Sequence, residues 1–431
     1  MRSIKLNLSK QSSTGWDGAV SLVDGYFSGN LKANQLLERL PNDFTGEKRA
    51  ICQSLFLGAL RHGHRVQAAL KPLLRKQPRS LVQAILLVAG YEMLVADDEK
   101  RPKIVHHAVE RGKQFVAKSE LGFLNAVLRR LPESLANITE PEQPADYYSH
   151  PQWLVERWNS EFGAQTTAQL LQWNQGTPQT YFKLYQTPGT IPYGLEATEW
   201  PQFYSATADA SWNDDLRPLL NNGDAYAKDP STRIAPGLLA PKINEAILDL
   251  CAAPGGKAFD IAHAMQQQGL IIAVDLPGKR IARLRENLST LKSEKLFCKI
   301  VEKDVLKLTH SDFAKQKLPE LYDGVMLDAP CSNTGVIQRR TDVKWRLNAN
   351  DIAACSELQT QLLKVASRFV KPHGRLVYST CSIENAENKD VVDAFLQSPE
   401  GTNFELKKAE QSLPWESGHD GAGAFLLVKK Q

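Results

Sequence analysis

The sequence predicts an α/β protein in which an all-helical domain and a small α+β subdomain precede a domain built on a parallel β-sheet. Its 431 residues allow two or three domains at roughly 150 residues each. Over residues 16–135 apolar side chains recur at helical spacing, and after Tyr226 short β-rich runs alternate with helical stretches. We therefore expect domains over residues 1–140, 141–235 and 236–431.

The helical domain carries the positive charge of the chain. Residues 1–140 contain 21 Lys and Arg against 13 Asp and Glu, whereas residues 141–431 contain 31 against 35. A basic excess in one domain is typical of proteins that bind RNA, although a solvated helical surface gives the same count. We expect this domain to contact RNA.

The middle subdomain follows a polar, proline-rich segment and is rich in aromatic residues. Residues 137–151 (NITEPEQPADYYSHP) interrupt the helical periodicity and indicate a linker. Residues 147–212 hold 14 of the 34 aromatic residues of the chain. Such side chains pack the core of a small subdomain, and some could also stack on unpaired bases.

The composition excludes several classes of protein. A net charge of +4 and 42% hydrophobic residues argue against disorder, and six cysteines without a Cys-x-x-Cys pair form neither a disulfide framework nor a zinc site. The N-terminal MRSIKLNLSKQSS has no signal-peptide core, and the longest apolar run, 81–96, contains Gln83 and Glu92. We expect a cytoplasmic monomer that binds neither a membrane nor a metal.

The first β-rich run, 247–251, leads directly into a glycine turn, CAAPGGK (251–257), and a helix beginning near Lys257. Gly255 and Gly256 let the backbone approach a ligand closely. The turn matches neither the dinucleotide-binding nor the Walker A pattern, which leaves a cofactor with a nucleoside but no pyrophosphate. Asp275 and Asp304 follow the next two runs, where they could contact ribose hydroxyls and an adenine amino group, although such aspartates also cap helices. Together these residues indicate a site for S-adenosylmethionine.

Two cysteines follow the fourth and fifth runs, 322–327 and 375–378. Cys331 lies in DAPCS and Cys381 in TCS, at the edge of the sheet that carries the cofactor turn. C5 of a pyrimidine becomes nucleophilic only after addition at C6, and a thiolate is a natural nucleophile for that addition. After methyl transfer to C5, a base removes the C5 proton and elimination frees the enzyme. Lys257 and Asp328 adjoin these turns and could contact the cytosine.

These motifs resemble the Nop/Sun family of RNA cytosine-5 methyltransferases, and within it the RsmB/Fmu/Sun group that acts on 16S rRNA. The resemblance rests on CAAPGGK (251–257), DAPCS (328–332) and TCS (380–382), and extends to RTDVKW (341–346) and LGFLNAVLRRL (121–131). It covers nearly the whole chain. It implies a seven-stranded Rossmann-like S-adenosylmethionine-dependent methyltransferase domain behind a NusB-like RNA-binding domain.

The resemblance also implies residue roles: Cys381 is the nucleophile, and Cys331 assists release of the methylated product. It places the cofactor contacts on Cys251, Ala252, Ala253, Pro254, Gly255, Gly256, Lys257, Asp275, Asp304 and Asp328. Arg280, in the basic segment KRIARLREN (279–287), could lie near the cofactor. The chain departs from the family pattern at Ala258, Pro277, AKDPST (227–232) and HDGAGAFLLVKK (419–430), which leaves the expected chemistry intact but the exact RNA target open.

The expected function is therefore S-adenosylmethionine-dependent methylation of cytosine C5 in RNA, and 16S rRNA is the expected substrate. The alternatives are the same reaction on tRNA or 23S rRNA, or a noncatalytic RNA-binding or ribosome-assembly factor. The presence of both cysteines, Lys257 and the site aspartates argues against the noncatalytic alternative. His62, His64, His106 and His107 have no metal-ligand context and are interpreted as helix-surface residues.

Overall fold

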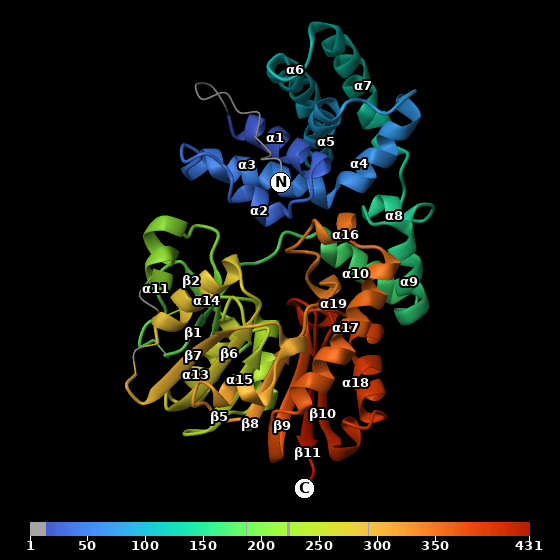
Figure 1. Ribbon diagram of the computed structural model, residues 1–431. Coiled ribbons are helices and arrows are strands. Elements are labelled where there is room, and N and C mark those ends of the chain that lie inside the picture. Colours follow the sequence, from blue (N-terminus) through green and yellow to red (C-terminus); the bar gives the residue numbers. More distant parts are fainter. Residues whose placement is uncertain (1–13, 187, 222–224, 292) are drawn as a thin grey trace. The chain divides into compact units, whose positions relative to one another are not determined.

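The computed structural model describes residues 14–186, 188–221, 225–291 and 293–431 (Figure 1). The expectation for the N-terminal segment, residues 1–13, lies outside the described residues. The chain forms two compact units. The first, the helical unit, contains the chain up to Thr177 together with Ile337–Arg346, and the second, the sheet unit, contains Pro178–Val336 and Leu347–Gln431.

The helical unit is built from amphipathic helices around one apolar core. Its helices are α1 (Gly15–Ser28), α2 (Ala33–Leu37), α3 (Gly46–Arg61), α4 (Gly63–Leu70), α5 (Ser80–Val95), α6 (Arg101–Gly112), α7 (Lys118–Ala136), α8 (Pro144–Tyr147), α9 (Gln152–Phe162), α10 (Ala164–Gln175) and α16 (Val343–Arg346). Helix α1 begins with a capping box: the Thr14 side chain accepts from the Asp17 N–H, and the Asp17 carboxylate accepts from the Thr14 N–H. The central helix α5 is apolar on most sides and is buried accordingly.

One segment of the helical unit comes from far down the chain. The indole of Trp345 donates to the carbonyl of Leu60 at 2.8 Å, and its ring stacks on His64 with centroids 3.8 Å apart. Arg61 donates to the carbonyl of Gln338 at 3.0 Å. RTDVKW, which the sequence boundaries assign to the catalytic domain, is therefore a packing element of the helical unit.

The interpretation of the four histidines is wrong for two of them. His62 stacks on Tyr91 and His64 on Trp345, so both are largely removed from water. Burial lowers the pKa of His62 to about 3 and that of His64 to about 3, which keeps both rings neutral. His106 and His107 are exposed on α6, as expected.

The sheet unit contains a small sheet and a large one. The small sheet has the order β2-β3-β1-β4 and the large sheet the order β10-β11-β9-β8-β5-β6-β7. The strands are β1 (Tyr181–Leu184), β2 (Leu195–Ala197), β3 (Phe203–Ala206), β4 (Ala225–Ala227), β5 (Ala246–Leu250), β6 (Gly269–Asp275), β7 (Leu296–Glu302), β8 (Tyr322–Asp328), β9 (Val370–Thr380), β10 (Phe404–Ser412) and β11 (Ala422–Lys429). The helices are α11 (Arg217–Asn221), α12 (Ile234–Leu239), α13 (Gly256–Ala264), α14 (Lys279–Ser289), α15 (His310–Ala314), α17 (Ala349–Ser367), α18 (Lys389–Leu396) and α19 (Pro414–Ser417).

The large sheet confirms the predicted fold class. The five predicted runs correspond to β5 to β9, which are parallel, and β11 adds an antiparallel strand that the run analysis did not identify. Alternation along β5 places Leu248 and Leu250 in the core on one face and Ile247 in the core on the other. Both faces are therefore covered, as a parallel sheet requires.

The expected subdomain 141–235 is divided between the two units. Helices α9 and α10 belong to the helical unit, whereas β1 to β4 belong to the sheet unit. A buried ion cluster explains the second assignment: Lys183 and Lys228, on or beside these strands, lie 2.8 and 2.7 Å from the carboxylate of Asp260 on α13. The compact units thus divide the chain at 177/178, 336/337 and 346/347, whereas the boundaries expected from the sequence are 140 and 235.

Candidate active site

The glycine turn joins β5 to α13 through backbone conformations that need small residues. Gly255 adopts φ +105°, and a Cβ there would lie 2.9 Å from the Leu284 side chain. The carboxylate of Asp275, at the end of β6, accepts from the N–H of Ala253 at 2.8 Å. Arg280, at the start of α14, donates to the Ala253 carbonyl. The structure thus brings Asp275 and Arg280 to the cofactor turn predicted from the sequence.

Asp304 caps a helix, which the sequence analysis gave as the alternative to contact with adenine. Its side chain accepts from the N–H of Leu306 at 3.0 Å and caps the short 3-10 helix Val305–Lys307. The capping interpretation is therefore correct for this geometry. Contact with an adenine amino group stays a prediction.

Lys257 and Asp328 form an ion pair between the cofactor turn and the end of β8. The Lys257 ammonium lies 2.6 Å from Asp328, which also accepts from the Ser379 hydroxyl at 3.1 Å. Burial by itself lowers the pKa of Lys257, but the Asp328 carboxylate outweighs it and raises that pKa above its ordinary value. Lys257 is therefore a fixed positive charge at neutral pH.

The two motif cysteines lie side by side. The register of parallel strands β8 and β9 sets the turns after them next to each other, and the Sγ atoms of Cys331 and Cys381 are 3.2 Å apart. The Cys381 thiol also donates to the side-chain oxygen of Asn333 at 3.4 Å. The hydrogen bond with Cys381, followed by burial, raises the pKa of Cys331 well above its ordinary value. The Cys331 thiol is therefore protonated at neutral pH.

Sequence reasoning missed Asp249. This residue is fully buried in β5, and neither carboxyl oxygen has a hydrogen-bond partner among the described residues. Burial, and then the negative charge of Asp328, raise the pKa of Asp249 to about 8. The available signal was an aspartate inside an otherwise apolar strand, AILDL.

The buried carboxyl group of Asp249 bears on whether this edge of the large sheet can hold the expected cofactor. S-adenosylmethionine carries an ammonium group and a sulfonium centre. A buried carboxyl without a partner is stabilised by a cation, so the residues present fit this group.

Comparison with known proteins finds a match for each of two domains. Residues 236–422 match the family model described as 16S rRNA methyltransferase RsmB/F, and residues 20–133 match the NusB family. The chain therefore contains a methyltransferase domain similar to RsmB/F and, in front of it, a domain similar to NusB. It is accordingly an S-adenosylmethionine-dependent methyltransferase.

Two curated relatives match most of this chain and most of their own length. Ribosomal RNA small subunit methyltransferase B of Proteus mirabilis is 29% identical, covering 93% of this chain and 95% of its own. The probable ribosomal RNA small subunit methyltransferase B of Bacillus subtilis is 27% identical over 86% of this chain and 85% of its own.

Two solved structures share the fold. The crystal structure of PH0851 has a TM-score of 0.75 and 22% identity, covering 98% of this chain and 100% of that one. NSun6 from Pyrococcus horikoshii, solved with SFG, has a TM-score of 0.54 and 17% identity, covering 65% of this chain and 98% of that one.

Among the described residues, no helix is both long and apolar enough to cross a membrane.

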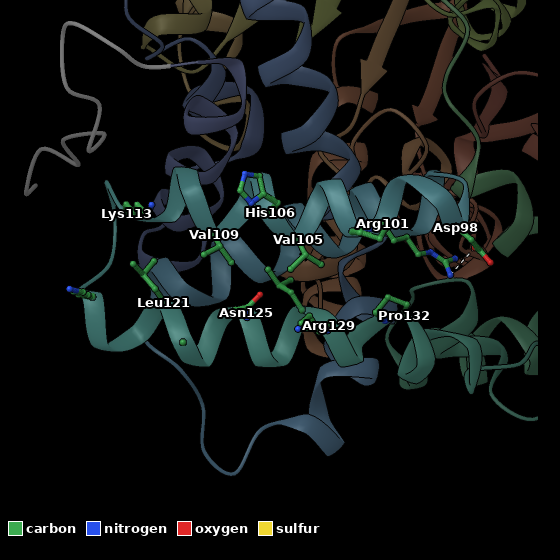
Figure 2. A pocket seen from close by; sticks show the side chains of 14 residues that line it. Asp98, Arg101, Val105, His106, Val109, Lys113, Leu121, Asn125, Arg129 and Pro132 are labelled. Carbon is green, nitrogen blue, oxygen red and sulfur yellow. Dashed lines mark ion pairs between the residues drawn. The ribbon is translucent and has the colours of Figure 1, made fainter.

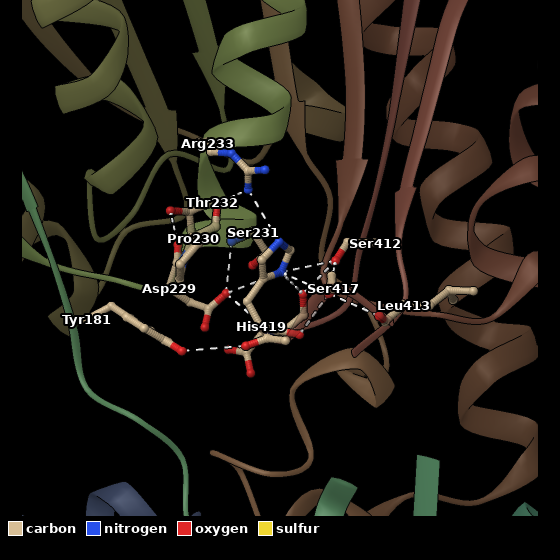
Figure 3. Close-up of polar contacts among 12 residues, drawn as sticks. Tyr181, Asp229, Pro230, Ser231, Thr232, Arg233, Ser412, Leu413, Ser417 and His419 are labelled. Atoms are coloured by element: carbon tan, nitrogen blue, oxygen red, sulfur yellow. Dashed lines mark hydrogen bonds and ion pairs between the residues drawn. The ribbon is translucent and has the colours of Figure 1, made fainter. Parts of the chain in front are cut away.

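The segments 227–232 and 419–430, which are expected to differ from the family pattern, contact each other in the sheet unit (Figure 3). Asp229 accepts from the N–H of Asp420 at 3.1 Å. The His419 ring lies 3.3 Å from Arg233 through Nε2 and 3.1 Å from Ser412 through Nδ1. Burial lowers the pKa of His419, so its ring joins this cluster as a neutral partner. These two segments are thus joined by one internal hydrogen-bond cluster.

Proposed function

We propose that this enzyme methylates C5 of a cytosine in RNA, with 16S rRNA as the substrate, through a covalent bond between Cys381 and C6. The observation that carries the proposal is the pair of thiols 3.2 Å apart beside the cofactor turn. The family description and the names of the curated relatives support small-subunit rRNA as the substrate.

When bound, S-adenosylmethionine would supply the methyl group as an electrophile, with S-adenosylhomocysteine as the leaving group. Residues 251–257, Asp275 and Arg280 would hold it, and Asp249 would face its positive charge. These residues orient the cofactor at the same sheet edge as the thiols.

The protein residues then act on the cytosine. The Cys381 thiolate adds to C6, the C5 carbon takes the methyl group, a base removes the C5 proton, and elimination restores the thiolate. The Lys257 ammonium and the Asp328 carboxylate, held together at 2.6 Å, orient the pyrimidine and its exocyclic amine. Cys331, which is protonated at neutral pH, serves turnover and product release.

The helical unit offers a surface for the RNA backbone. A groove of about 810 Å³ runs between α6 and α7, with Val105, Val109 and Leu121 among its lining residues (Figure 2). Its lining also includes the basic residues Arg101, His106, Lys113, Lys118 and Arg129, against one acidic residue, Asp98. This charge suits phosphate groups.

Bisulfite sequencing of RNA from cells with and without the protein tests the proposal. We expect one methylcytosine to disappear from 16S rRNA when the gene is deleted, and to return with the wild-type protein but not with Cys381→Ala. Loss of a site in tRNA or 23S rRNA instead would overturn the substrate. An unchanged map would favour a noncatalytic assembly factor.

A further inference from the structure

We propose that Glu387 is the positioning residue that holds the two thiols in register, through one buried carboxylate bound to both cysteine turns. Glu387 ends the short 3-10 helix Asn385–Glu387 and is fully buried. The inference rests on the proposed two-cysteine chemistry. Neither the motifs nor the family comparison gives this residue a role.

The carboxylate binds the residue that follows each cysteine. Oε1 accepts from the Ser332 N–H at 2.8 Å, and Oε2 accepts from the Ser382 hydroxyl at 2.5 Å and from the Ser332 hydroxyl. Ser332 follows Cys331, and Ser382 follows Cys381. The serines of DAPCS and TCS are therefore two anchors on one acceptor.

A second set of bonds ties the other side of the first turn. The Gln359 amide, on α17, donates both to Glu387 Oε1 at 3.1 Å and to the carbonyl of Pro330 at 2.9 Å. Gln359 is fully buried. The Cys331 backbone is thus held from the residue before it and from the residue after it.

The turn that carries Cys381 is held in the same way. Asn388, next to Glu387, donates to the Ser382 carbonyl at 2.8 Å and accepts from the Thr380 hydroxyl at 2.7 Å. The Tyr378 hydroxyl donates to the Glu387 carbonyl at 2.5 Å. The backbone on both sides of Cys381 is therefore fixed to residues 387 and 388.

A carboxylate suits this place for a physical reason. Four donors converge on it, and charge-assisted hydrogen bonds are shorter and stronger than neutral ones, which offsets the cost of burying the charge. A misplacement of about 1 Å at a reacting group can cost on the order of 100-fold in rate. Glu387 acts through the two serines, so its effect is on geometry.

Glu387→Gln tests the inference because it preserves the shape and one acceptor oxygen while removing the charge. We expect the single-turnover rate of methyl transfer to fall roughly 10- to 100-fold. The KM for RNA and the affinity for S-adenosylhomocysteine should stay within about twofold of wild type, because the substitution changes no residue proposed to bind RNA or the cofactor. A full single-turnover rate in this variant would overturn the proposal.

The matched control is Asp323→Asn at the opposite end of β8. Asp323 also ties strands together, accepting from the Ala246 N–H at 2.9 Å and from Lys371 at 2.7 Å. This variant should melt earlier but keep the wild-type rate at 25 °C. A rate loss equal to that of Glu387→Gln would reduce Glu387 to general scaffolding and overturn the proposal.

Coupling with the serines gives a readout that overall stability does not move. Ser332→Ala and Ser382→Ala should each slow methyl transfer about tenfold in the wild type and much less in Glu387→Gln, since the acceptor is already weakened. Additive losses would contradict a shared anchor. If the wild-type enzyme methylates an atom other than C5, the proposed function is overturned. The same single and combined variants of Glu387 and the two serines, measured on that reaction, then still test whether Glu387 holds the cysteine turns.

Discussion

At the scale of single residues, the two thiols are neighbours in space but differ in their surroundings. Cys381 donates to Asn333, whereas the hydrogen bond between the two thiols, followed by burial, raises the pKa of Cys331. A nucleophile and a release-assisting thiol fail at opposite ends of a covalent cycle. Single substitutions therefore separate them.

Cys381→Ala should abolish methyl transfer and form no protein–RNA adduct, because nothing adds to C6. Cys331→Ala should still form the adduct and transfer the methyl group, but should release product poorly. Denaturing gels then show a protein–RNA band with Cys331→Ala, and the double variant lacks it. A trapped band with Cys381→Ala instead would exchange the two roles.

Asp249 gives the protein without cofactor a dependence on pH. Its folded pKa of about 8 lies above the value of about 3.9 in an unfolded chain, so the folded state binds the extra proton. The associated stability is present below pH 4 and is lost as the pH rises toward 8. Wild type should therefore become less stable than Asp249→Asn across this window.

The measurement is chemical unfolding of both proteins, without cofactor, from pH 5 to pH 8. The difference in unfolding free energy should change by up to about 1.4 kcal/mol per pH unit in favour of the variant. A difference that does not vary with pH would show that Asp249 titrates normally. The same variant should bind S-adenosylmethionine more weakly, because the cationic cofactor loses its counter-charge.

At the scale of elements, helices α6 and α7 pair to form the basic groove. Lys118 and Arg129 are exposed residues of α7 that line it. Changing both to Gln should lower RNA affinity and reduce the slope of log affinity against log salt by roughly two units for duplex RNA, about one per phosphate contact.

The control for the groove is Lys103→Gln. Lys103 is exposed on α6 but does not line the groove, so its loss should leave the salt slope close to wild type. Equal effects of all three positions would mean that RNA responds to the charge of the unit as a whole. S-adenosylmethionine binding should be unchanged throughout.

At the scale of the whole molecule, no single cut in the chain separates the two units, since Ile337–Arg346 belongs to the helical unit. A fragment that begins at residue 141 leaves Trp345 without Leu60 and His64. Its stability therefore reports on this packing as well as on the catalytic sheet.

Trp345→Ala should lower the free energy of unfolding of the full chain by about 2–3 kcal/mol, because it removes a partly buried indole from the helical core. In the fragment 141–431 the same substitution should cost little, since the partner helices are absent. Trp212→Ala, at a residue 48% exposed in the sheet unit, is the control. Equal costs in both backgrounds would place Trp345 outside the helical core.

The local features could be predicted from the sequence alone. Strand runs, the glycine turn and the order of the cysteine motifs are readable because period, turn chemistry and motif spacing are encoded within a few residues. The five central strands and the juxtaposition of Cys331 and Cys381 followed from these features and from the rule that parallel strands end at one edge.

Features that depend on distant partners could be seen only in the folded protein. The packing of residues 337–346 with the helical unit, the burial of His62 and His64, and the contacts of Glu387 all join residues far apart in sequence or shield them from water. Periodicity shows which face of an element is apolar, but it does not show which element covers that face. The sequence alone therefore does not distinguish a buried carboxyl group, such as that of Asp249 or Glu387, from one that is exposed to solvent.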